Sequence, residues 1–276
     1  MIIIADSGST KTHWCRVDEN GVRNLETQGL NPRFTDSLTR LTEIRHARKA
    51  LGSPDQVFFY GSGCGTEEMQ MSIVSELLIV FLHAECVCEG DLLGACRATC
   101  GNNEGMVGIL GTGSNLCYYD GKQIVRQRVS TGYILGDEGS GNHIGKRLLK
   151  DYLEERMPMN VRNMFYDDYR LTNAQILDQL YLQPFPNRFL ATFASFAAQH
   201  QEDEYVASVL HDCFSAFFEQ LDYFGRYRYT PLNLVGGLVH SFLPTLQQVA
   251  ERHCVTLGTL MPDPMEGLIR FHGIHC

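Results

Sequence analysis

Two glycine turns carry the residues of this sequence whose types and spacing best suit chemistry. The first, Asp6-Ser7-Gly8-Ser9-Thr10-Lys11-Thr12, follows the apolar run Ile2–Ala5, and the second, Gly111-Thr112-Gly113-Ser114-Asn115, follows Met106–Leu110. Glycine lets the backbone come close to a ligand, and successive N–H groups in such a turn form a concave anion site. Two such loops, about a hundred residues apart, indicate two similar halves that bind one polyphosphate. The pattern predicts nucleotide-dependent phosphoryl transfer.

The elements that must position these loops occur twice in the same order, three strands followed by a helix, which predicts two three-layer α/β halves. Ligands of such folds bind where strands end in loops, which indicates a site in a cleft between the halves. In the first half we expect strands at Ile2–Asp6, Thr12–Val17, Val22–Thr27, Val57–Tyr60 and Cys86–Glu89, and helices over residues 38–51, 66–83 and 91–100. In the second half we expect strands at Met106–Leu110, Asn115–Tyr119, Gln123–Val129, Leu232–Val235 and Val255–Leu257, and helices over residues 142–155, most of 161–229, and 240–253.

The composition is that of an ordinary globular protein. Hydrophobic residues make up 44% of the 276 residues and charged residues 20%, which argues against disorder and allows one large domain or two modest ones. The net charge of -9 excludes the basic face that a nucleic-acid-binding protein needs. No apolar run reaches the length of a membrane span, and Asp6 comes too early for a signal peptide. We expect a cytoplasmic protein without nucleic-acid or membrane partners.

Ten cysteines in a chain without a secretory signal indicate reduced thiols. Four of them, Cys86, Cys88, Cys96 and Cys100, lie close together along the chain. Their C-x-C and C-x3-C spacings differ from the paired C-x-x-C of a metal site. We therefore interpret them as small buried hydrophobic residues, with a metal cluster as the alternative.

The first glycine loop resembles the first phosphate loop of the superfamily that contains acetate and sugar kinases, actin and the heat-shock ATPases. Together, the second loop and Gly136-Asp137-Glu138-Gly139-Ser140 are similar to the N-acetylglucosamine kinase branch, which also contains the acyl-CoA dehydratase/reductase activator ATPases. The resemblance spans residues 1 to about 240. It implies an α/β fold of two ribonuclease-H-like (actin-like ATPase) domains with a cleft between them. The N-terminal domain would cover residues 1–104 and the C-terminal domain, with extra helices, residues 105–261; segment 262–276 would pack on the first domain.

The resemblance also implies ATP and Mg²⁺ as cofactors. Asp6 would hold Mg²⁺ through water, since hard cations favour carboxylate oxygens, and Thr112 would hydrogen-bond the γ-phosphate. The alternative for each loop is an ordinary glycine turn without a ligand, and for the pair at 236–237 a tight strand–helix turn. The residues expected to bind the nucleotide are Ser7, Gly8, Ser9, Thr10, Lys11, Gly111, Thr112, Gly113, Gly236 and Gly237.

Asp91 is the expected catalytic base, because the family places an aspartate at this strand end beside the acceptor hydroxyl and Gly94-Ala95 continue the match. A base needs hydrogen-bond reach to the hydroxyl. The alternative is a helix N-cap, and both roles can hold together. The expected sugar contacts are Asn31, Asp91, Ser114, Asn115 and Asp137. Amides suit sugars because they donate and accept at once, although Asn31 could equally serve the turn before Pro32.

These roles favour an ATP-dependent kinase for an amino sugar, with N-acetylglucosamine giving its 6-phosphate as the leading reaction. Glucosamine, N-acetylmannosamine and N-acetylmuramic acid stay open as substrates. The alternative, motivated by the cysteine content, is an activator ATPase that shares an iron–sulfur cluster across a dimer. A third class is a non-catalytic sugar or nucleotide sensor on the same fold. The sequence leaves the oligomeric state open, with a homodimer the commonest soluble arrangement.

Overall fold

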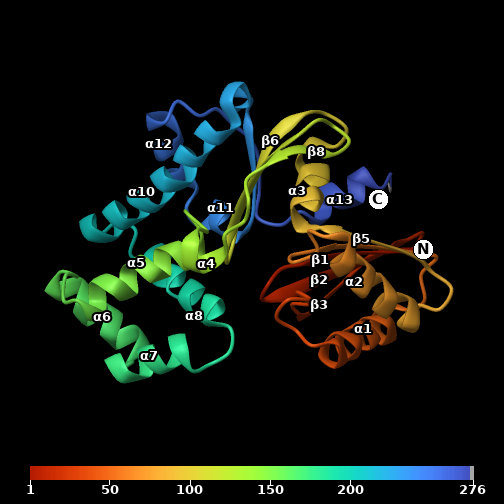
Figure 1. Cartoon of the computed structure of the whole chain (residues 1–276), viewed down its shortest axis with the longest axis horizontal. Helices are drawn as coiled ribbons and strands as arrows, with labels where there is room; N and C mark the ends of the chain where they lie inside the picture. Colours follow the sequence, from red (N-terminus) through yellow and green to blue (C-terminus); the bar gives the residue numbers. More distant parts are fainter. Residues whose placement is uncertain (274–276) are drawn as a thin grey trace. The chain divides into compact units, whose positions relative to one another are not determined.

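The computed structural model describes residues 1–273 and divides into two compact units, each taken by itself below (Figure 1). The first unit contains Met1–Glu104, Tyr119–Ile124 and the chain from Asp263 onward, and the second contains Gly105–Tyr118 and Val125–Pro262. Each unit has one five-stranded sheet with helices packed on it. The α/β class with two actin-like ATPase domains, predicted from the sequence, is confirmed.

The sheet of the first unit has the strand order β3-β2-β1-β4-β5. The first three strands pair antiparallel, as hairpins with short turns require, whereas β1, β4 and β5 run parallel. The carboxyl ends of these three parallel strands therefore meet at one edge, where loops can bind a ligand. The strands are β1 (Ile2–Ser7), β2 (Lys11–Asp18), β3 (Gly21–Gln28), β4 (Gln56–Gly61) and β5 (Glu85–Gly90).

Helices cover both faces of this sheet (Figure 1). Successive strand residues point to opposite faces, so Ile3 and Phe59 pack with α1 and α2 in one core, while α3 and α13 contact strands from the other side. A Cβ at Gly267 of α13 would lie 2.3 Å from the carbonyl oxygen of Ala98 on α3, so only glycine allows this close approach. The helices are α1 (Ser37–Leu51), α2 (Glu67–Val80), α3 (Asp91–Cys100) and α13 (Met265–Phe271). Residues 274–276 of the terminal segment lie outside the described residues.

The turn at Tyr119–Ile124 groups with the first unit, although the sequence suggested the second half for it. The Tyr119 hydroxyl donates to the carbonyl oxygen of Gly101 at 3.2 Å. A Cβ at Gly121 would lie 2.4 Å from the carbonyl oxygen of Asn102. These close local contacts hold the turn against the end of α3.

The sheet of the second unit has the order β10-β9-β6-β7-β8, and β6, β9 and β10 run parallel. The ends of β6 and β9 thus lie side by side. Phe214, Phe217 and Phe224 are buried in the core, so the helical aromatic run serves packing, as its spacing predicted. The strands are β6 (Gly105–Leu110), β7 (Ser114–Tyr119), β8 (Ile124–Gln127), β9 (Leu232–Val235) and β10 (Leu257–Met261).

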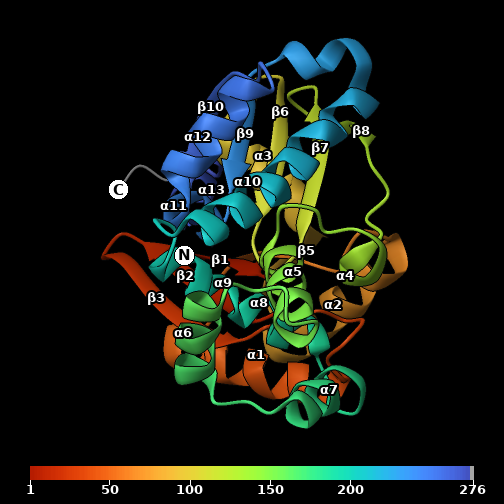
Figure 2. The same ribbon diagram turned by 90° about the vertical axis from the view of Figure 1, so that its left-hand side faces the viewer.

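Most of this unit is helical, and α10 and α12 pack against each other, in front of the strands in Figure 2. No helix within residues 1–273 has the length and apolar character that crossing a membrane requires. The helices are α4 (Gly132–Leu135), α5 (Gly141–Leu153), α6 (Met159–Tyr169), α7 (Asn173–Tyr181), α8 (Pro186–Thr192), α9 (Ala194–Gln199), α10 (Glu204–Glu219), the 3₁₀ segment Gln220–Tyr229, α11 (Gly237–Ser241) and α12 (Leu243–Arg252).

The expected elements appear in the expected order, with two local corrections in the second half. The single helix expected over residues 240–253 is two helices, because Pro244 lacks an N–H and begins a new helix, α12. The strand expected at Val255–Leu257 begins only at Leu257. The Val255 N–H instead closes the preceding helix end by donating to the Ala250 carbonyl oxygen at 2.9 Å.

Candidate active site

Three parallel strands of the first unit end at the same edge, and this register brings predicted site residues together. Asp6 on β1 lies opposite Tyr60 on β4, and Gly61 lies opposite Gly90 on β5. Asp91 follows Gly90 directly. Since neighbouring strands are about 4.8 Å apart, β1 and β5 are separated by about 10 Å. Asp6 and Asp91 therefore flank the loop after β4, as expected of a base and a cation-binding carboxylate.

Asp6 lies in an environment that disfavours its negative charge. Burial raises its pKa to about 7, and the nearby carboxylates of Asp263 and Asp91 add to the rise, while His13 and Lys11 oppose it. A carboxylate placed among other carboxylates is stabilised when a cation binds. The charge distribution thus suits an ion held next to Asp6.

Asp91 occupies the first position of α3 rather than the N-cap. The N-cap is Gly90, which makes no side-chain capping bond, so the capping alternative does not describe Asp91. Its Oδ1 accepts a hydrogen bond from the Leu92 N–H at 2.8 Å. Burial raises the pKa of Asp91 to about 6, against two backbone hydrogen bonds that lower it. A carboxyl of this kind titrates close to neutral pH, where a general base works best.

The first glycine loop is held in place by hydrogen bonds of its own. The Gly8 N–H donates to the Lys11 carbonyl at 2.9 Å, and the Gly29 N–H donates to the Thr10 carbonyl at 3.0 Å. A Cβ at Gly29 would lie 2.5 Å from the Gly8 oxygen and 2.8 Å from the Ser9 oxygen. Gly29 therefore lets the next segment of chain pack directly on the loop.

Two predicted nucleotide ligands in this loop use their side chains within the protein. Thr12 Oγ1 donates to the Gln28 carbonyl, so in the 2.8 Å contact between the two hydroxyls Ser7 is the donor. Ser7 Oγ also accepts from the Leu30 N–H at 3.0 Å, which makes this hydroxyl a brace of the loop. The Lys11 ammonium pairs with Glu26 on β3, both side chains being exposed.

Asn31 forms the turn that the sequence left as an alternative. Its Oδ1 accepts from the Arg33 N–H at 2.9 Å, and its Nδ2 donates to Ser62 Oγ at 3.2 Å. A Cβ at Gly63, whose φ is +82°, would lie 2.3 Å from Asn31 Oδ1. The side chain is therefore buried and fixed between two loops, and one amide hydrogen remains for a ligand.

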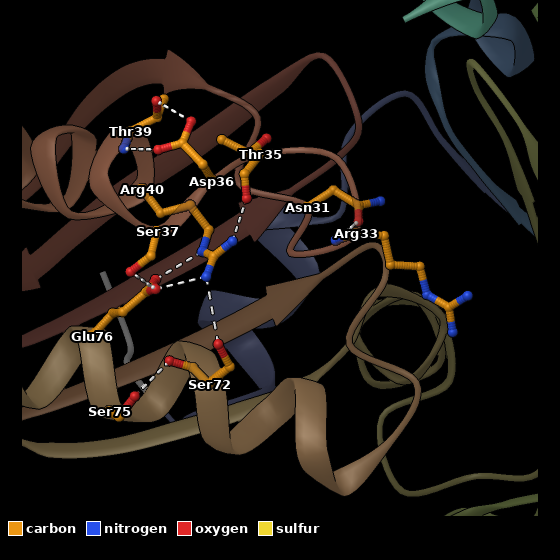
Figure 3. Close-up of polar contacts among 10 residues, drawn as sticks. All are labelled: Asn31, Arg33, Thr35, Asp36, Ser37, Thr39, Arg40, Ser72, Ser75 and Glu76. Atoms are coloured by element: carbon orange, nitrogen blue, oxygen red, sulfur yellow. Dashed lines mark hydrogen bonds and ion pairs between the residues drawn. The ribbon is translucent and has the colours of Figure 1, made fainter.

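A buried ion pair anchors the segment that contains Asn31 (Figure 3). Arg40 donates through Nε and Nη2 to the two carboxylate oxygens of Glu76, at 2.8 and 2.6 Å. Its Nη1 donates to the Thr35 carbonyl oxygen, and the Thr35 N–H donates in turn to the Asn31 carbonyl at 2.9 Å. The pair thus links α1 and α2 to the Asn31 turn.

Asp263 is a candidate site residue that the sequence did not reveal. His13 lies opposite Asp6 on β2, and its Nδ1 is 3.1 Å from Asp263 Oδ2. The hydrogen bond to Asp263 raises the pKa of His13, against the effect of burial. Burial also acts to raise the pKa of Asp263, but the hydrogen bonds from His13 and the Met265 N–H outweigh it, so that pKa is lowered. The pair places a second ionised carboxylate near Asp6.

In the second unit, the predicted loop docks on the start of α5. The Gly111 N–H donates to the Gly113 carbonyl at 3.0 Å, closing the turn. The N–H groups of Gly141 and Asn142 donate to the carbonyls of Gly111 and Thr112, at 2.9 and 3.0 Å. Nothing lies within 4 Å of a Cβ built at Gly111. The loop therefore has a fixed backbone and an open side.

Asp137 contacts this loop directly. Its Oδ1 accepts from the Ser114 N–H at 3.3 Å and its Oδ2 from Asn142 Nδ2 at 3.0 Å. Burial raises the pKa of Asp137, although both hydrogen bonds lower it. The Oδ1 of Asn142 is buried without a hydrogen-bond donor among residues 1–273, which marks Asn142 as a further candidate contact. Asn115 starts β7 and accepts from the Leu116 N–H.

The glycine pair at 236–237 lies next to the same loop, because Ile109 of β6 is opposite Val235 of β9. Gly236 has a φ of +134°, and a Cβ there would lie 2.1 Å from the Leu110 carbonyl oxygen. A Cβ at Gly237 would meet nothing within 4 Å. The structure thus brings together the second loop, Asp137 and the glycine pair within one unit.

The chain matches no protein-family model and no curated protein sequence, but solved structures do match. A Porphyromonas gingivalis protein, provisionally named as an N-acetylglucosamine kinase, is 37% identical with a TM-score of 0.90, over 99% of this chain and 98% of its own. A Chromobacterium violaceum protein with the same provisional name is 19% identical, with a TM-score of 0.70 over 98% of each chain. A Listeria monocytogenes protein, provisionally named as an N-acetylmannosamine kinase, is 12% identical, with a TM-score of 0.58 over 98% of this chain and 97% of its own.

The last two similarities show the fold, whereas the first, at 37% identity over nearly the whole of both chains, shows the family. The resemblance carried by the two glycine loops is confirmed. This chain belongs to the N-acetylglucosamine kinase branch of the sugar kinase and actin-like ATPase superfamily, and it is an ATP-dependent kinase.

Proposed function

We propose that this kinase phosphorylates an amino sugar, with N-acetylglucosamine converted to its 6-phosphate. The observation that carries the proposal is the pair of carboxylates at one sheet edge, Asp6 at the end of β1 and Asp91 at the start of α3. Phosphoryl transfer needs positioned phosphates, neutralised charge and a base beside the attacking hydroxyl. Two aspartates in different surroundings can divide the last two tasks.

Asp91 is proposed as the base. Its carboxylate would accept the proton of the sugar hydroxyl while that oxygen bonds to the γ-phosphorus and the bond to the β-phosphate oxygen breaks, releasing ADP. Burial raises its pKa to about 6, so the carboxylate is ionised at neutral pH and still basic enough to take a proton. The backbone bond from Leu92 fixes the carboxyl orientation.

Asp6 is proposed to hold Mg²⁺, which would neutralise charge on the transferring phosphate. The chemistry of the residues fits a cation, because Asp91 and Asp263 both act on Asp6 with negative charge. Within residues 1–273, no three His, Cys, Asp or Glu side chains are arranged as ligands of one ion. This suits Mg²⁺, which keeps several waters and binds one or two carboxylates together with substrate phosphates.

The sugar contacts are proposed from amide and carboxylate groups with capacity left for a ligand. In the first unit, Asn31 retains one amide hydrogen after its two hydrogen bonds. In the second unit, Asn142 Oδ1 lacks a donor and lies on the side chain that fixes Asp137. A buried acceptor without a donor is costly, and a sugar hydroxyl or N-acetyl N–H would satisfy it.

The test is ADP release from Mg·ATP with glucosamine, N-acetylglucosamine, N-acetylmannosamine and N-acetylmuramic acid, in the wild type and in Asp91→Asn. We expect sugar-stimulated turnover, greatest with N-acetylglucosamine, that falls at least ~100-fold in Asp91→Asn, the typical contribution of a general base. Tight ATP binding without turnover on any sugar would sink the kinase proposal.

The activator-ATPase alternative predicts a different result in the same assay, namely ATP hydrolysis without sugar and unaffected by Asp91→Asn. Its structural requirement is a cluster ligand set. Of the four clustered cysteines, Cys88 and Cys96 are buried, and residues 1–273 contain no group of side chains placed to hold a metal. The interpretation of these thiols as small buried residues therefore stands.

A further inference from the structure

Arg188 on α8 is a guanidinium with buried donors and no acceptor. Its Nε and Nη2 are both buried and lack a hydrogen-bond partner among residues 1–273. The guanidinium carbon lies 4.0 Å from the centre of the Phe185 ring. Such stacking offsets part of the cost of burial, but it acts on the flat face of the group. The N–H donors point outward in the plane, so Phe185 cannot satisfy them.

The same pair of nitrogens binds a carboxylate elsewhere in this protein. Arg40 uses Nε and Nη2 to hold the two oxygens of Glu76, and Arg16 uses Nε and Nη2 to hold Asp18. These two nitrogens form one edge of the planar guanidinium, which matches a carboxylate or phosphate bidentately. Arg188 presents the same edge without an acidic side chain to receive it.

The electrostatics agree with the geometry. Burial lowers the pKa of Arg188 and is the only influence that shifts it, so no carboxylate of the described residues compensates the charge. By contrast, Asp151 and Asp212 both act on Arg147 and help to raise its pKa. A buried cation without a counter-charge is costly, and groups retained at such a cost often serve binding.

The position of α8 connects Arg188 to the second glycine loop. A Cβ at Gly145 would lie 1.8 Å from the Leu190 carbonyl oxygen, and a Cβ at Gly141 would lie 3.1 Å from Ala191 Cβ. The two helices therefore pack without intervening side chains. Gly141 also donates to the Gly111 carbonyl. Arg188 thus lies one helical turn from the residue that packs on the base of the loop.

We propose that Arg188 is the binding residue for an oxyanion of a ligand, a phosphate or a carboxylate that accepts from Nε and Nη2 together. This site goes beyond the proposed reaction, which assigns no role to Arg188. The ligand would reach the buried edge by displacing the segment before α8. Leu182 in that segment is 74% exposed, and Gln183 and Pro184 are also exposed, so it can move without opening the core.

The substitution Arg188→Met separates a binding role from a structural one. Methionine keeps much of the apolar stem that packs in the protein and removes the uncompensated charge. A binding role predicts an unfolding midpoint equal to or above that of the wild type, with oxyanion affinity reduced. The matched control is Arg40→Met, which breaks a compensated buried pair and should lower the midpoint. Arg188→Lys keeps the charge without the bidentate edge and should also weaken binding.

The experiment measures calorimetric binding of inorganic phosphate, N-acetylglucosamine 6-phosphate and N-acetylmuramic acid, with neutral N-acetylglucosamine as the reference, together with thermal unfolding of each unliganded protein. We expect affinity for an oxyanion to fall about tenfold or more in Arg188→Met, as for loss of a charge-assisted bond, with N-acetylglucosamine affinity unchanged. Loss for the two phosphates identifies a phosphate group as the ligand, and loss for N-acetylmuramic acid alone identifies a sugar carboxylate.

Three results would overturn the proposal: no oxyanion binding by the wild type, unchanged oxyanion affinity in Arg188→Met, or an unfolding midpoint that falls as in Arg40→Met with all ligands weakened alike. Because binding is measured without turnover, failure of the sugar kinase proposal would leave this test intact.

Discussion

The buried pair of Arg40 and Glu76 allows a prediction whose size follows from the structure. Their side chains are 7% and 5% exposed, and two hydrogen bonds join them. Arg40→Met would leave the Glu76 carboxylate with the Ser37 hydroxyl, 2.6 Å away, as its remaining listed donor in the network of Figure 3. Breaking one side of such a pair costs about 3–5 kcal/mol. The double variant Arg40→Met/Glu76→Met removes both charges and should be near neutral in stability.

The double variant isolates the effect on the site. It loses the donor to the Thr35 carbonyl, which anchors the Asn31 turn. Losing a charge-assisted hydrogen bond of about 1.5 kcal/mol corresponds to about tenfold in an equilibrium constant. We therefore expect the KM for the sugar to rise about tenfold while the KM for ATP stays unchanged. Urea unfolding of the two single variants and the double variant gives the coupling energy, and steady-state kinetics with each substrate varied gives the two KM values.

Two results would refute this reasoning. If Arg40→Met were within about 1 kcal/mol of the wild type, below the range for a buried pair, the pair would not be desolvated as described. If the double variant were stable and its sugar KM unchanged, the Asn31 turn would not depend on Arg40.

Three further predictions follow from single residues. If Asp91 is the base, log kcat/KM should fall with unit slope as pH drops below about 6, the pKa to which burial raises this carboxyl, because the proton acceptor must be ionised; a flat profile from pH 5 to 8 measured with buffers of constant ionic strength would contradict the assignment. Gly63→Ala should raise the sugar KM more than it lowers stability, because its Cβ would meet the end of the Asn31 side chain at 2.3 Å, which can move, at a backbone cost of about 1–2 kcal/mol; kinetics and urea unfolding compared side by side check this order. Gly236→Ala should destabilise the protein by more than about 3 kcal/mol, since its Cβ would meet a backbone oxygen at 2.1 Å and its φ is +134°; a variant with unchanged unfolding midpoint would show that the turn is not built as described.

The fold was predictable because its signals are local. Alternating and continuous apolar runs gave the strands, and the turn residues between them gave the hairpins. The two glycine loops could be placed at strand ends because each directly follows an apolar run. The element boundaries failed where tertiary packing decides them, as at Pro244 and Val255.

The site was predictable only where its residues lie in motifs. Asp6, Asp91 and Asp137 stand beside glycine turns, whereas Asp263 meets His13 across 250 positions of the chain. Nothing in the sequence near either residue announces that contact. Arg40 likewise looked like one of several basic residues on an amphipathic helix, and only the packing of α1 on α2 shows that it is buried against Glu76. Arg188 gave no signal at all, because an orphaned donor is a property of its surroundings.

The measurement that tests the central claim most directly is phosphorus NMR of the wild type and Asp91→Asn incubated with Mg·ATP and N-acetylglucosamine. We predict a phosphomonoester resonance that couples to the protons on carbon 6 of the sugar and grows together with ADP in the wild type, and that is nearly absent in Asp91→Asn at equal ATP affinity. ADP and inorganic phosphate without a sugar phosphate, or equal sugar phosphate from both proteins, would contradict the account.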